Sequence, residues 1–331
     1  MKNFAYVRAI STEDAVQKAL EKNNSLFIAG GTNLVDRLKA FLDEPDELID
    51  ISRLKLKEIK STSNGGIRIG AMVTNTAVAN HPQIKSDYPL LSRAILSGAS
   101  QQIRNMATVG GNLLQRTRCP YYYDTAFNCN KRQPGSGCPA INGINKMHAI
   151  LGASNDCIAV HPSDMCVALA ALDAVVEVEG EKGQRQIPFT DFHRLPGNTP
   201  QEDTNLESGE LITAIILPPT TWANTGVYLK LRDRASYSFA LISVAGIVEV
   251  KNKNIRNARI ALGGVAHKPW RSLEAETFLQ GKSATASNFE QAANIALEKA
   301  QPLEHNEFKV EMAKRAIKRA LMISAQGGGV A

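Results

Sequence analysis

Apolar residues along this chain follow two different spacings, which together predict an α+β protein with short strands and amphipathic helices. Residues 11–22 begin with a Ser-Thr cap and acidic residues, and then place Ala15, Val16, Ala19 and Leu20 at helical spacing. Other segments contain short apolar runs between turn residues, a pattern typical of buried strands. We predict strands at 26–29, 47–52, 67–73, 175–180, 210–219, 227–232, 240–250 and 255–266, and helices starting near residue 33 and at 90–100, 164–174 and 285–324.

The pattern changes near residues 219–226, around the sequence PPTTWANTG. Before this point strands and helices are mixed, whereas after it three strands are followed by amphipathic helices. A chain of 331 residues is long enough for more than one hydrophobic core. We therefore predict two α+β domains, at residues 1–222 and 223–331.

Two segments place paired glycines beside a hydroxyl and an amide side chain. GGTN at residues 30–33 lies between a predicted strand and a predicted helix, and TVGGN at residues 108–112 follows a polar segment. Paired glycines allow positive φ and remove Cβ bulk, so that a phosphate can approach main-chain N–H groups. One such turn is equally typical of an ordinary strand–helix connection, but two favour a long ligand with a diphosphate. The spacing is not G-x-G-x-x-G, which argues against a Rossmann dehydrogenase.

The cysteines of the chain are clustered. Four of the five fall within 39 residues, separated by 9, 8 and 18 residues: Cys119, Cys129, Cys138 and Cys157. They lie in an irregular stretch at about 116–160 that is rich in Gly, Pro and Asn, which favours a functional segment. The spacing contains no C-x-x-C pair, so it does not fit a zinc ribbon or knuckle. A metal cluster is favoured, disulfides and another kind of zinc site remain alternatives, and Cys166 is expected to be a buried core thiol.

Aromatic and basic residues surround these cysteines. The tyrosines expected to shield a cluster are Tyr121, Tyr122 and Tyr123. The basic side chains expected to offset the charge of four thiolates are Arg116, Arg118, Lys131 and Arg132. The same mixture of residues is also compatible with a nucleic-acid-binding patch.

Composition and charge add little to this picture. The net charge is +6, with basic residues spread along the chain, which fits an anionic cofactor better than a nucleic acid. No apolar run approaches the roughly 20 residues that cross a bilayer. Polar residues from Ser11 to Asp14 interrupt the start of the chain, so we expect no export signal on it.

Longer motifs carry a family resemblance. IAGGTNL is followed about 75 residues later by TVGGN, which lies within GASQQIRNMATVGGNLLQRTRCPYYYDTAFNCNKRQPGSGCPA, and then by HPSDM and KLRDRASYSFAL. Over essentially its whole length the chain resembles the flavin-binding medium subunits of the xanthine dehydrogenase and carbon monoxide dehydrogenase family, and among them the aldehyde oxidoreductases. This resemblance implies a two-part FAD-binding domain of the vanillyl-alcohol oxidase (PCMH) type. A smaller domain of the CO dehydrogenase flavoprotein type follows, with three antiparallel strands plus helices.

The resemblance also implies roles for particular residues. Residues 26–34 would wrap the FAD diphosphate, Asp164 would reach the sugar-like chain, and Lys230 would approach the isoalloxazine. The residues alone would favour plainer roles, with Asp164 as a helix N-cap and Lys230 as a solvated strand lysine. The full FAD-binding set implied is Leu26, Phe27, Ile28, Ala29, Gly30, Gly31, Thr32, Asn33, Leu34, Thr108, Gly111, Asn112, Asp164 and Lys230.

The function implied by the resemblance is electron transfer within a molybdenum-dependent aldehyde oxidoreductase. A large partner subunit would hold the molybdenum cofactor and oxidise the aldehyde, a small partner would carry [2Fe–2S] clusters, and this chain would complete a heterotrimer. Its FAD would pass electrons to an external acceptor, and its four clustered cysteines would hold a [4Fe–4S] cluster. No residue of this chain would touch the aldehyde. The complex would be periplasmic through a partner's export signal, and otherwise cytoplasmic.

Two alternatives belong to other classes. A self-contained FAD-dependent oxidase would need its own substrate cavity and a residue for covalent attachment of FAD, for which His161 and Cys157 are the nearby candidates. A nucleic-acid-binding protein with a metal cluster would bind DNA or RNA in a salt-sensitive way and carry no flavin.

Overall fold

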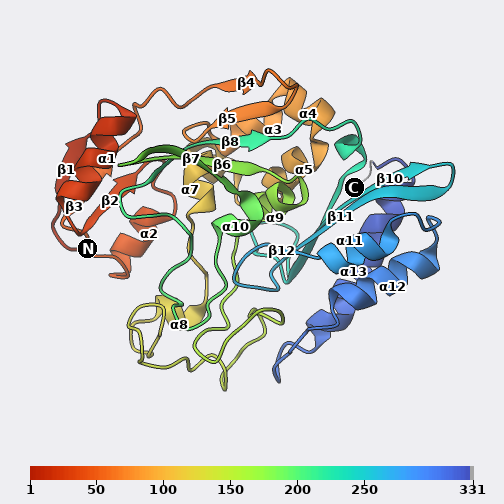
Figure 1. The fold of residues 1–331 in the computed structure, drawn as a ribbon. Helices are drawn as coiled ribbons and strands as arrows, with labels where there is room; N and C mark the ends of the chain where they lie inside the picture. The colour runs from red at the N-terminus through yellow and green to blue at the C-terminus, as the bar shows by residue number, and fades with distance from the viewer. Residues whose placement is uncertain (329–331) are drawn as a thin grey trace.

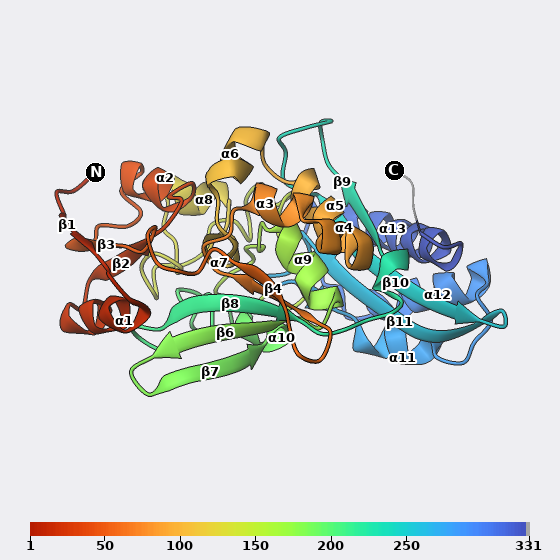
Figure 2. The same cartoon turned by 90° about the horizontal axis from the view of Figure 1, so that it is seen from above.

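The computed structural model describes residues 1–328 and contains three β-sheets, with the N-terminal sheet at one end of the molecule and the C-terminal sheet at the other (Figures 1 and 2). The predicted α+β fold class is confirmed. Within the described range, no helix combines the length and the apolar composition that crossing a membrane requires.

The first sheet has three parallel strands in the order β1-β3-β2. Its elements are β1 (Ala5–Arg8), α1 (Thr12–Glu21), β2 (Ser25–Ile28), α2 (Leu34–Lys39) and β3 (Glu47–Asp50). Helix α1 begins as predicted, because the Ser11 side chain caps it and accepts a hydrogen bond from Asp14 N. The helix buries Ala15 and Val16. The chain leaves β2 through GGTN and enters α2, so this turn lies at the carboxyl end of a strand.

The second sheet has five antiparallel strands in the order β4-β5-β8-β6-β7. Its strands are β4 (Ile59–Ser61), β5 (Ile67–Gly70), β6 (Val175–Gly180), β7 (Gly183–Pro188) and β8 (Leu211–Leu217). The helices packed around it are α3 (Asn75–Asn80), α4 (Pro82–Asp87), α5 (Pro89–Ser97), α6 (Gln101–Met106), α7 (Val109–Leu113), α9 (Asp164–Ala171) and α10 (Phe189–Phe192). Ile69, Ile215 and Val176 from the sheet and Leu91 and Cys166 from the helices share one core, so the prediction of a buried thiol at Cys166 is confirmed.

Between α7 and α9 the chain is irregular. Residues 114–163, all of which are described, contain one short helix, α8 (Pro120–Tyr123), and no strand. The backbone is held instead by turns and by side chains that bond to carbonyl groups, such as Arg132 to Tyr121 O and Tyr122 O. We refer to residues 114–163 as the insert.

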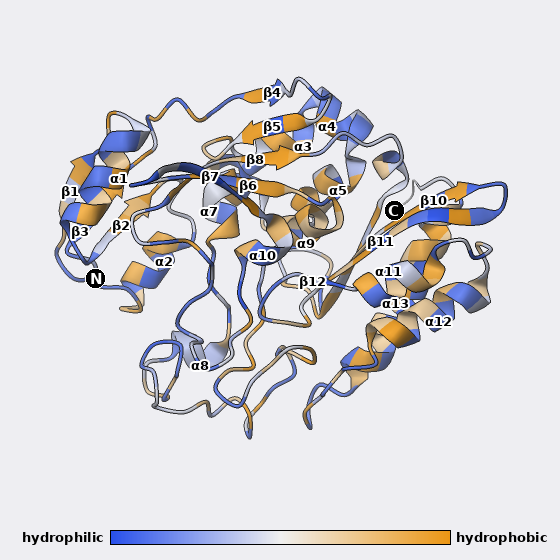
Figure 3. Ribbon diagram, viewed as in Figure 1, coloured by the Kyte–Doolittle hydropathy of each residue, from blue (hydrophilic) through white to orange (hydrophobic). Residues whose placement is uncertain are grey.

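The C-terminal sheet has four antiparallel strands in the order β12-β11-β10-β9. Its strands are β9 (Val227–Leu231), β10 (Ile242–Lys251), β11 (Asn254–Gly263) and β12 (Trp270–Arg271), preceded by a 3₁₀ turn, η1 (Ala223–Thr225). Helices α11 (Leu273–Leu279) and α13 (Phe308–Ala325) pack against this sheet, and α12 (Ala286–Ala296) packs against both of them. Helices α12 and α13 carry alternating apolar and polar stripes (Figure 3). The three long strands match the prediction, whereas the two-residue β12 is too short to leave a pattern in the sequence.

The second glycine segment differs from its predicted form. TVGGN is not a loop but the start of a helix, because Thr108 is the N-cap of α7 and accepts a hydrogen bond from Gly111 N at 3.3 Å. Both paired-glycine segments therefore introduce short helices.

Candidate functional site

The two glycine segments meet at a pair of adjoining cavities. The first cavity, of about 290 Å³, lies over the β2–α2 turn, and the second, of about 380 Å³, extends toward α9 and β9. Both are lined by Thr32, Asn33, Ala107 and Gly111, so the two cavities adjoin and extend over both glycine segments. Their combined extent suits a long ligand rather than a compact one.

Gly30 explains why the β2–α2 turn needs glycine. A Cβ atom at this position would lie 1.9 Å from the carbonyl oxygen of Met106, at the end of α6. Gly31 adds a φ of 70°, which other residues rarely adopt. The glycines therefore let the turn pack directly against the backbone that leads into α7, and the two helix starts face the same cavity.

The structure brings the predicted FAD-binding residues together. Every member of the set lines the first or the second cavity except Ile28. The residues on the first cavity are Leu26, Phe27, Ala29, Gly30, Gly31, Thr32, Asn33, Leu34, Thr108 and Gly111. Those that line the second include Asn112, Asp164 and Lys230, which are far apart in the sequence.

Asp164 and Lys230 form a buried ion pair in the second cavity. Their Nζ and Oδ2 atoms are 2.7 Å apart, and the two side chains are 9% and 5% exposed. The other carboxylate oxygen accepts a 2.7 Å hydrogen bond from Tyr228 OH, and burial together with this carboxylate raises the pKa of the Tyr228 phenol well above its ordinary value. The plainer roles are wrong, because Ser163 is the N-cap of α9 and Lys230 is not solvated. The roles of both residues toward FAD stay predictions.

Sequence reasoning missed Asn75, which lines the second cavity. Asn75 is 4% exposed, and its Oδ1 is buried without a hydrogen-bond partner among the described residues. A buried acceptor of this kind normally has a partner, so Asn75 fits a donor group on a bound ligand. No motif marks Asn75 in the sequence, since its place depends on how α3 packs against α6.

The four clustered cysteines line a single cavity in the insert, which we call the cysteine cavity. All of them are free. Burial is the main reason that the pKa of Cys119 rises to about 12 and that of Cys157 to about 11, so both are protonated thiols at neutral pH. Among residues 1–328, no three of these sulfur atoms lie within 4.8 Å of one another.

The basic residues around the cysteines are mostly engaged elsewhere. Arg116 Nε and Lys131 Nζ each lie 2.6 Å from a carboxylate oxygen of Asp203, and Arg118 pairs with Asp36 and stacks over Tyr123. Burial acts to raise the pKa of Asp203, but the two cations outweigh it and hold that pKa well below its usual range. Arg116 and Lys131 are therefore paired with a carboxylate, although the charge of Lys131 still acts to lower the pKa of Cys157, as the expected offset of thiolate charge requires. Of the tyrosines, Tyr121 and Tyr122 line the cysteine cavity, whereas the lining does not include Tyr123.

A second residue missed by sequence reasoning is His148, which lies in the irregular insert. It is 2% exposed, and its Nε2 lies 3.1 Å from the Sγ of Cys119. Burial lowers the pKa of His148 to about 4, so the ring is neutral. The sequence around His148 has neither an apolar periodicity nor a motif that would identify it as a site residue.

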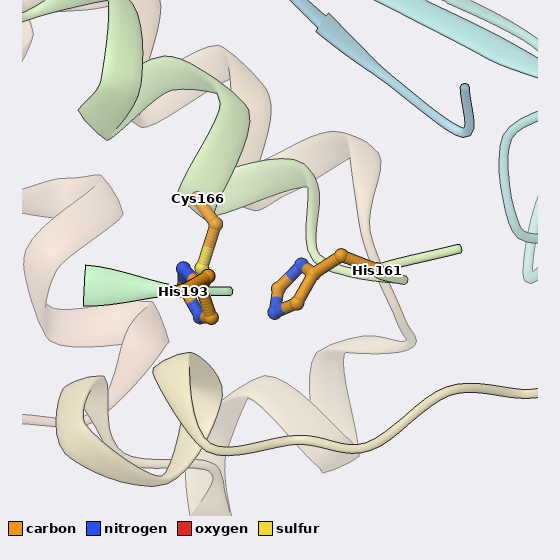
Figure 4. A group of neighbouring side chains, drawn as sticks. All are labelled: His161, Cys166 and His193. Atoms are coloured by element: carbon orange, nitrogen blue, oxygen red, sulfur yellow. The ribbon is translucent and has the colours of Figure 1, made fainter. Parts of the chain in front are cut away.

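His161, Cys166 and His193 form a compact group beside α9 (Figure 4). The centroids of the two imidazole rings lie 4.3 Å apart. Each of the three residues offers one possible metal ligand atom, and these three atoms lie within 4.8 Å of one another. His161 Nδ1 accepts a hydrogen bond from Ser163 N at 3.3 Å, so its proton lies on Nε2, the atom that would have to bind a metal ion. The group is therefore better suited to core packing than to holding a metal.

His193 makes the fold sensitive to acid. Burial lowers its pKa to about 4, compared with about 6.5 in an unfolded chain. The unfolded chain gains a proton as the pH falls below 6.5, but the folded chain does not do so until about pH 4. We therefore expect this residue to reduce the free energy of unfolding by about 3 kcal/mol as the pH falls from 6.5 to 4.

Urea unfolding measured from pH 7.5 to 4 checks this expectation. The variant His193→Phe should show a shallower loss of stability in that range than the wild-type protein. His305→Phe, at an exposed position, is the control and should keep the wild-type slope. Equal slopes in all three proteins would contradict the assignment.

Comparison with known proteins gives matches over nearly the whole chain. A family described as the FAD binding domain in molybdopterin dehydrogenase matches residues 2–220, and the CO dehydrogenase flavoprotein C-terminal domain matches residues 227–323. The chain is 48% identical over 323 residues to the aldehyde oxidoreductase FAD-binding subunit PaoB of Escherichia coli (strain K12), covering 97% of this chain and 98% of that protein. It is 31% identical to the glyceraldehyde dehydrogenase medium chain of Sulfolobus acidocaldarius, covering 84% and 82%.

Solved structures of proteins with related names have the same fold over nearly the whole chain. Quinoline 2-oxidoreductase from Pseudomonas putida 86 has a chain with a TM-score of 0.76 and 25% identity, covering 99% of both chains. Carbon monoxide dehydrogenase from Hydrogenophaga pseudoflava gives a TM-score of 0.76 and 25% identity, covering 97% of both chains. The similarity therefore extends over both the FAD-binding part and the C-terminal sheet.

Proposed function

Because the chain belongs to the family of FAD-binding medium subunits of molybdenum hydroxylases, as its motifs predicted, we propose that it is the electron-transfer subunit of an aldehyde oxidoreductase. It is an oxidoreductase subunit that binds FAD. The observation that supports the proposal most directly is that both paired-glycine helix starts line the two adjoining cavities. Bound there, FAD would supply a centre that accepts electrons singly and releases one or two at a time.

Different residues of the two adjoining cavities would contact different parts of the FAD. At the start of α2, Val35 N donates to Gly31 O, but no side chain caps the helix, and the glycines leave the other first-turn amides open to the diphosphate. Asn112 and Asn75 add polar side chains farther along, and the pair of Asp164 and Lys230 closes the far end. Since Lys230 is already neutralised by Asp164, it would orient the flavin through hydrogen bonds more than through net charge.

We further propose that Cys119, Cys129, Cys138 and Cys157 bind a [4Fe–4S] cluster. The four free cysteines line one cavity, which supports a shared metal centre. Tetrahedral zinc with sulfur atoms 2.3 Å away would place those sulfurs only about 3.8 Å apart. Among residues 1–328 no three of the four sulfurs lie within 4.8 Å of one another, which suits a larger cluster better than a single zinc ion. Free thiols likewise favour metal binding over disulfides.

The partners and the location complete the proposal. A large subunit with the molybdenum cofactor would oxidise the aldehyde, and a small subunit with [2Fe–2S] clusters would deliver electrons to this chain. Relatives are named as subunits or medium chains, which supports a heterotrimer. The complex would be exported to the periplasm through a partner's signal, and an external acceptor would take the electrons.

The variant Gly111→Val tests the flavin site. Gly111 lines both cavities, and a Cβ atom there would meet only Thr108 Oγ1, at 3.0 Å, among the described residues. The valine side chain should therefore fill the ligand space at small cost to the fold. We expect the purified heterotrimer to lose at least nine-tenths of its FAD and its steady-state aldehyde oxidation, while aldehyde still reduces the [2Fe–2S] clusters once.

Absorption spectra, released flavin and stopped-flow reduction measure these effects. Ala5→Val, at an exposed residue that lines neither cavity, should leave all three unchanged. Full flavin occupancy in Gly111→Val would remove α7 from the site. Aldehyde oxidation by the isolated chain would instead favour a self-contained oxidase.

A further inference from the structure

Within the insert, the sulfur of Cys119 contacts a residue that the proposed function does not use. The Nε2 atom of His148 lies 3.1 Å from the Sγ of Cys119, and the other ring nitrogen, Nδ1, is buried without a hydrogen-bond partner among residues 1–328. A cysteine sulfur bound to iron is a thiolate, which can only accept hydrogen bonds. In the metal-bound protein the imidazole must therefore carry its proton on Nε2 and donate it to this sulfur.

His148 is held in place by the C-terminal part of the chain. Lys309 and Asn306 are both fully buried at the start of α13. Lys309 Nζ donates to His148 O at 2.7 Å, and Asn306 Nδ2 donates to His148 O at 3.4 Å and to Ala149 O at 3.2 Å. Asn145, three residues earlier, accepts from His305 N at 3.0 Å. Buried polar groups on a segment about 160 residues away thus fix the loop that carries the imidazole.

Cys119 differs from the other three cysteines in what it faces. It lines the cysteine cavity and also a third cavity, of about 230 Å³, which His148 lines as well. The third cavity shares Arg118, Met147, Ser163 and Asp164 with the second cavity, in which we place the flavin. Cys119 and His148 therefore lie on the side of the cysteine cavity that faces the flavin.

We propose that His148 is a positioning residue that hydrogen-bonds the Cys119 ligand of the cluster and raises the reduction potential of the cluster. This inference rests on the [4Fe–4S] cluster of the proposed function. Reduction adds one electron and one negative charge to the cluster and its thiolates. A hydrogen bond to a ligand sulfur stabilises the more negative state more strongly, so it raises the potential.

The test is a redox titration of the intact heterotrimer, followed by electron paramagnetic resonance of the reduced [4Fe–4S] signal. His148→Phe removes the donor, and we expect the equilibrium constant for cluster reduction to fall at least tenfold, which is 59 mV for a one-electron couple. Iron, sulfide and flavin contents should remain at wild-type levels. His148→Gln retains an N–H donor and should restore most of the potential.

His305→Gln is the matched control, because His305 is exposed and meets the same loop only through its backbone N–H. It should leave the potential unchanged. An unchanged potential in His148→Phe would overturn the inference, because the hydrogen bond would then have no effect on the cluster. Loss of iron in that variant alone would also overturn it, because His148 would then be a ligand or a structural residue.

A measurement on the wild-type protein covers the case in which His148→Phe does not fold. With ¹⁵N-labelled histidine, the reduced cluster should show a hyperfine coupling to one nitrogen, and His148→Gln should lose it. No coupling in the wild-type protein would overturn the inference. A heterotrimer without a [4Fe–4S] signal would instead overturn the proposed function, so the two failures are distinguishable.

Discussion

Serine in place of any one of the four clustered cysteines should lower the iron content of the insert toward zero. Cys119, Cys129, Cys138 and Cys157 all line the cysteine cavity, so each is expected to supply one ligand. Cys166 lies in the core of the second sheet and lines no part of that cavity. Cys166→Ser should therefore keep full iron content. Iron and acid-labile sulfide per chain, measured after anaerobic purification of the heterotrimer, decide the matter.

The same experiment separates the alternatives for these residues. Equal losses in all five variants would overturn the ligand assignment and point to general misfolding. Stoichiometric zinc without sulfide would replace the cluster with a zinc site. Intact iron in one of the four variants would mean that another residue supplies the missing ligand, and His148 is the nearest candidate on the Cys119 side.

Asp203→Ala should destabilise the protein by about 3–5 kcal/mol, because it leaves buried cations without their counter-charge. Lys131 is 1% exposed at its side chain and Arg116 is 17% exposed, and both depend on the Asp203 carboxylate. Lys131 would retain only the Pro200 carbonyl as an acceptor. Because both cations belong to the insert, we also expect faster proteolysis between residues 114 and 163. Denaturant unfolding and limited proteolysis provide the measurements.

Asp233→Ala is the control for this effect. Asp233 pairs with Lys146, which also belongs to the insert, but both side chains are about half exposed. An exposed ion pair contributes less than about 1 kcal/mol, so this variant should stay near wild-type stability. If the two variants lost equal stability, the Asp203 network would not be what holds the insert in place.

The fold could be predicted wherever the apolar pattern was strong. The apolar run of β8 and the helical spacing in α1 and α13 were recognisable because burial of one face or of both faces leaves a period in the sequence. The short strands β1 and β7 were missed. Both lie at sheet edges and are largely exposed, so their residues carry little apolar signal.

The candidate site divides in the same way. Paired glycines indicate a close backbone approach, and both pairs lie at the two adjoining cavities. The pairing of Asp164 with Lys230 joins residues 66 positions apart, and it depends on where β9 lies relative to α9. The contact of His148 with Cys119 depends on a loop held by α13. Such contacts arise from tertiary packing alone, and no local pattern encodes them.

The insert and the flavin cavity are joined by a short stretch of chain, and this limits how far they can separate. Cys157 lines the cysteine cavity, and Asp164, seven residues later, lines the second cavity. Seven residues span at most about 25 Å even when fully extended. The peptide itself thus acts as a tether of fixed length. A flavin in the second cavity and a cluster in the cysteine cavity, as proposed above, would therefore stay within this distance of each other however the partner subunits dock.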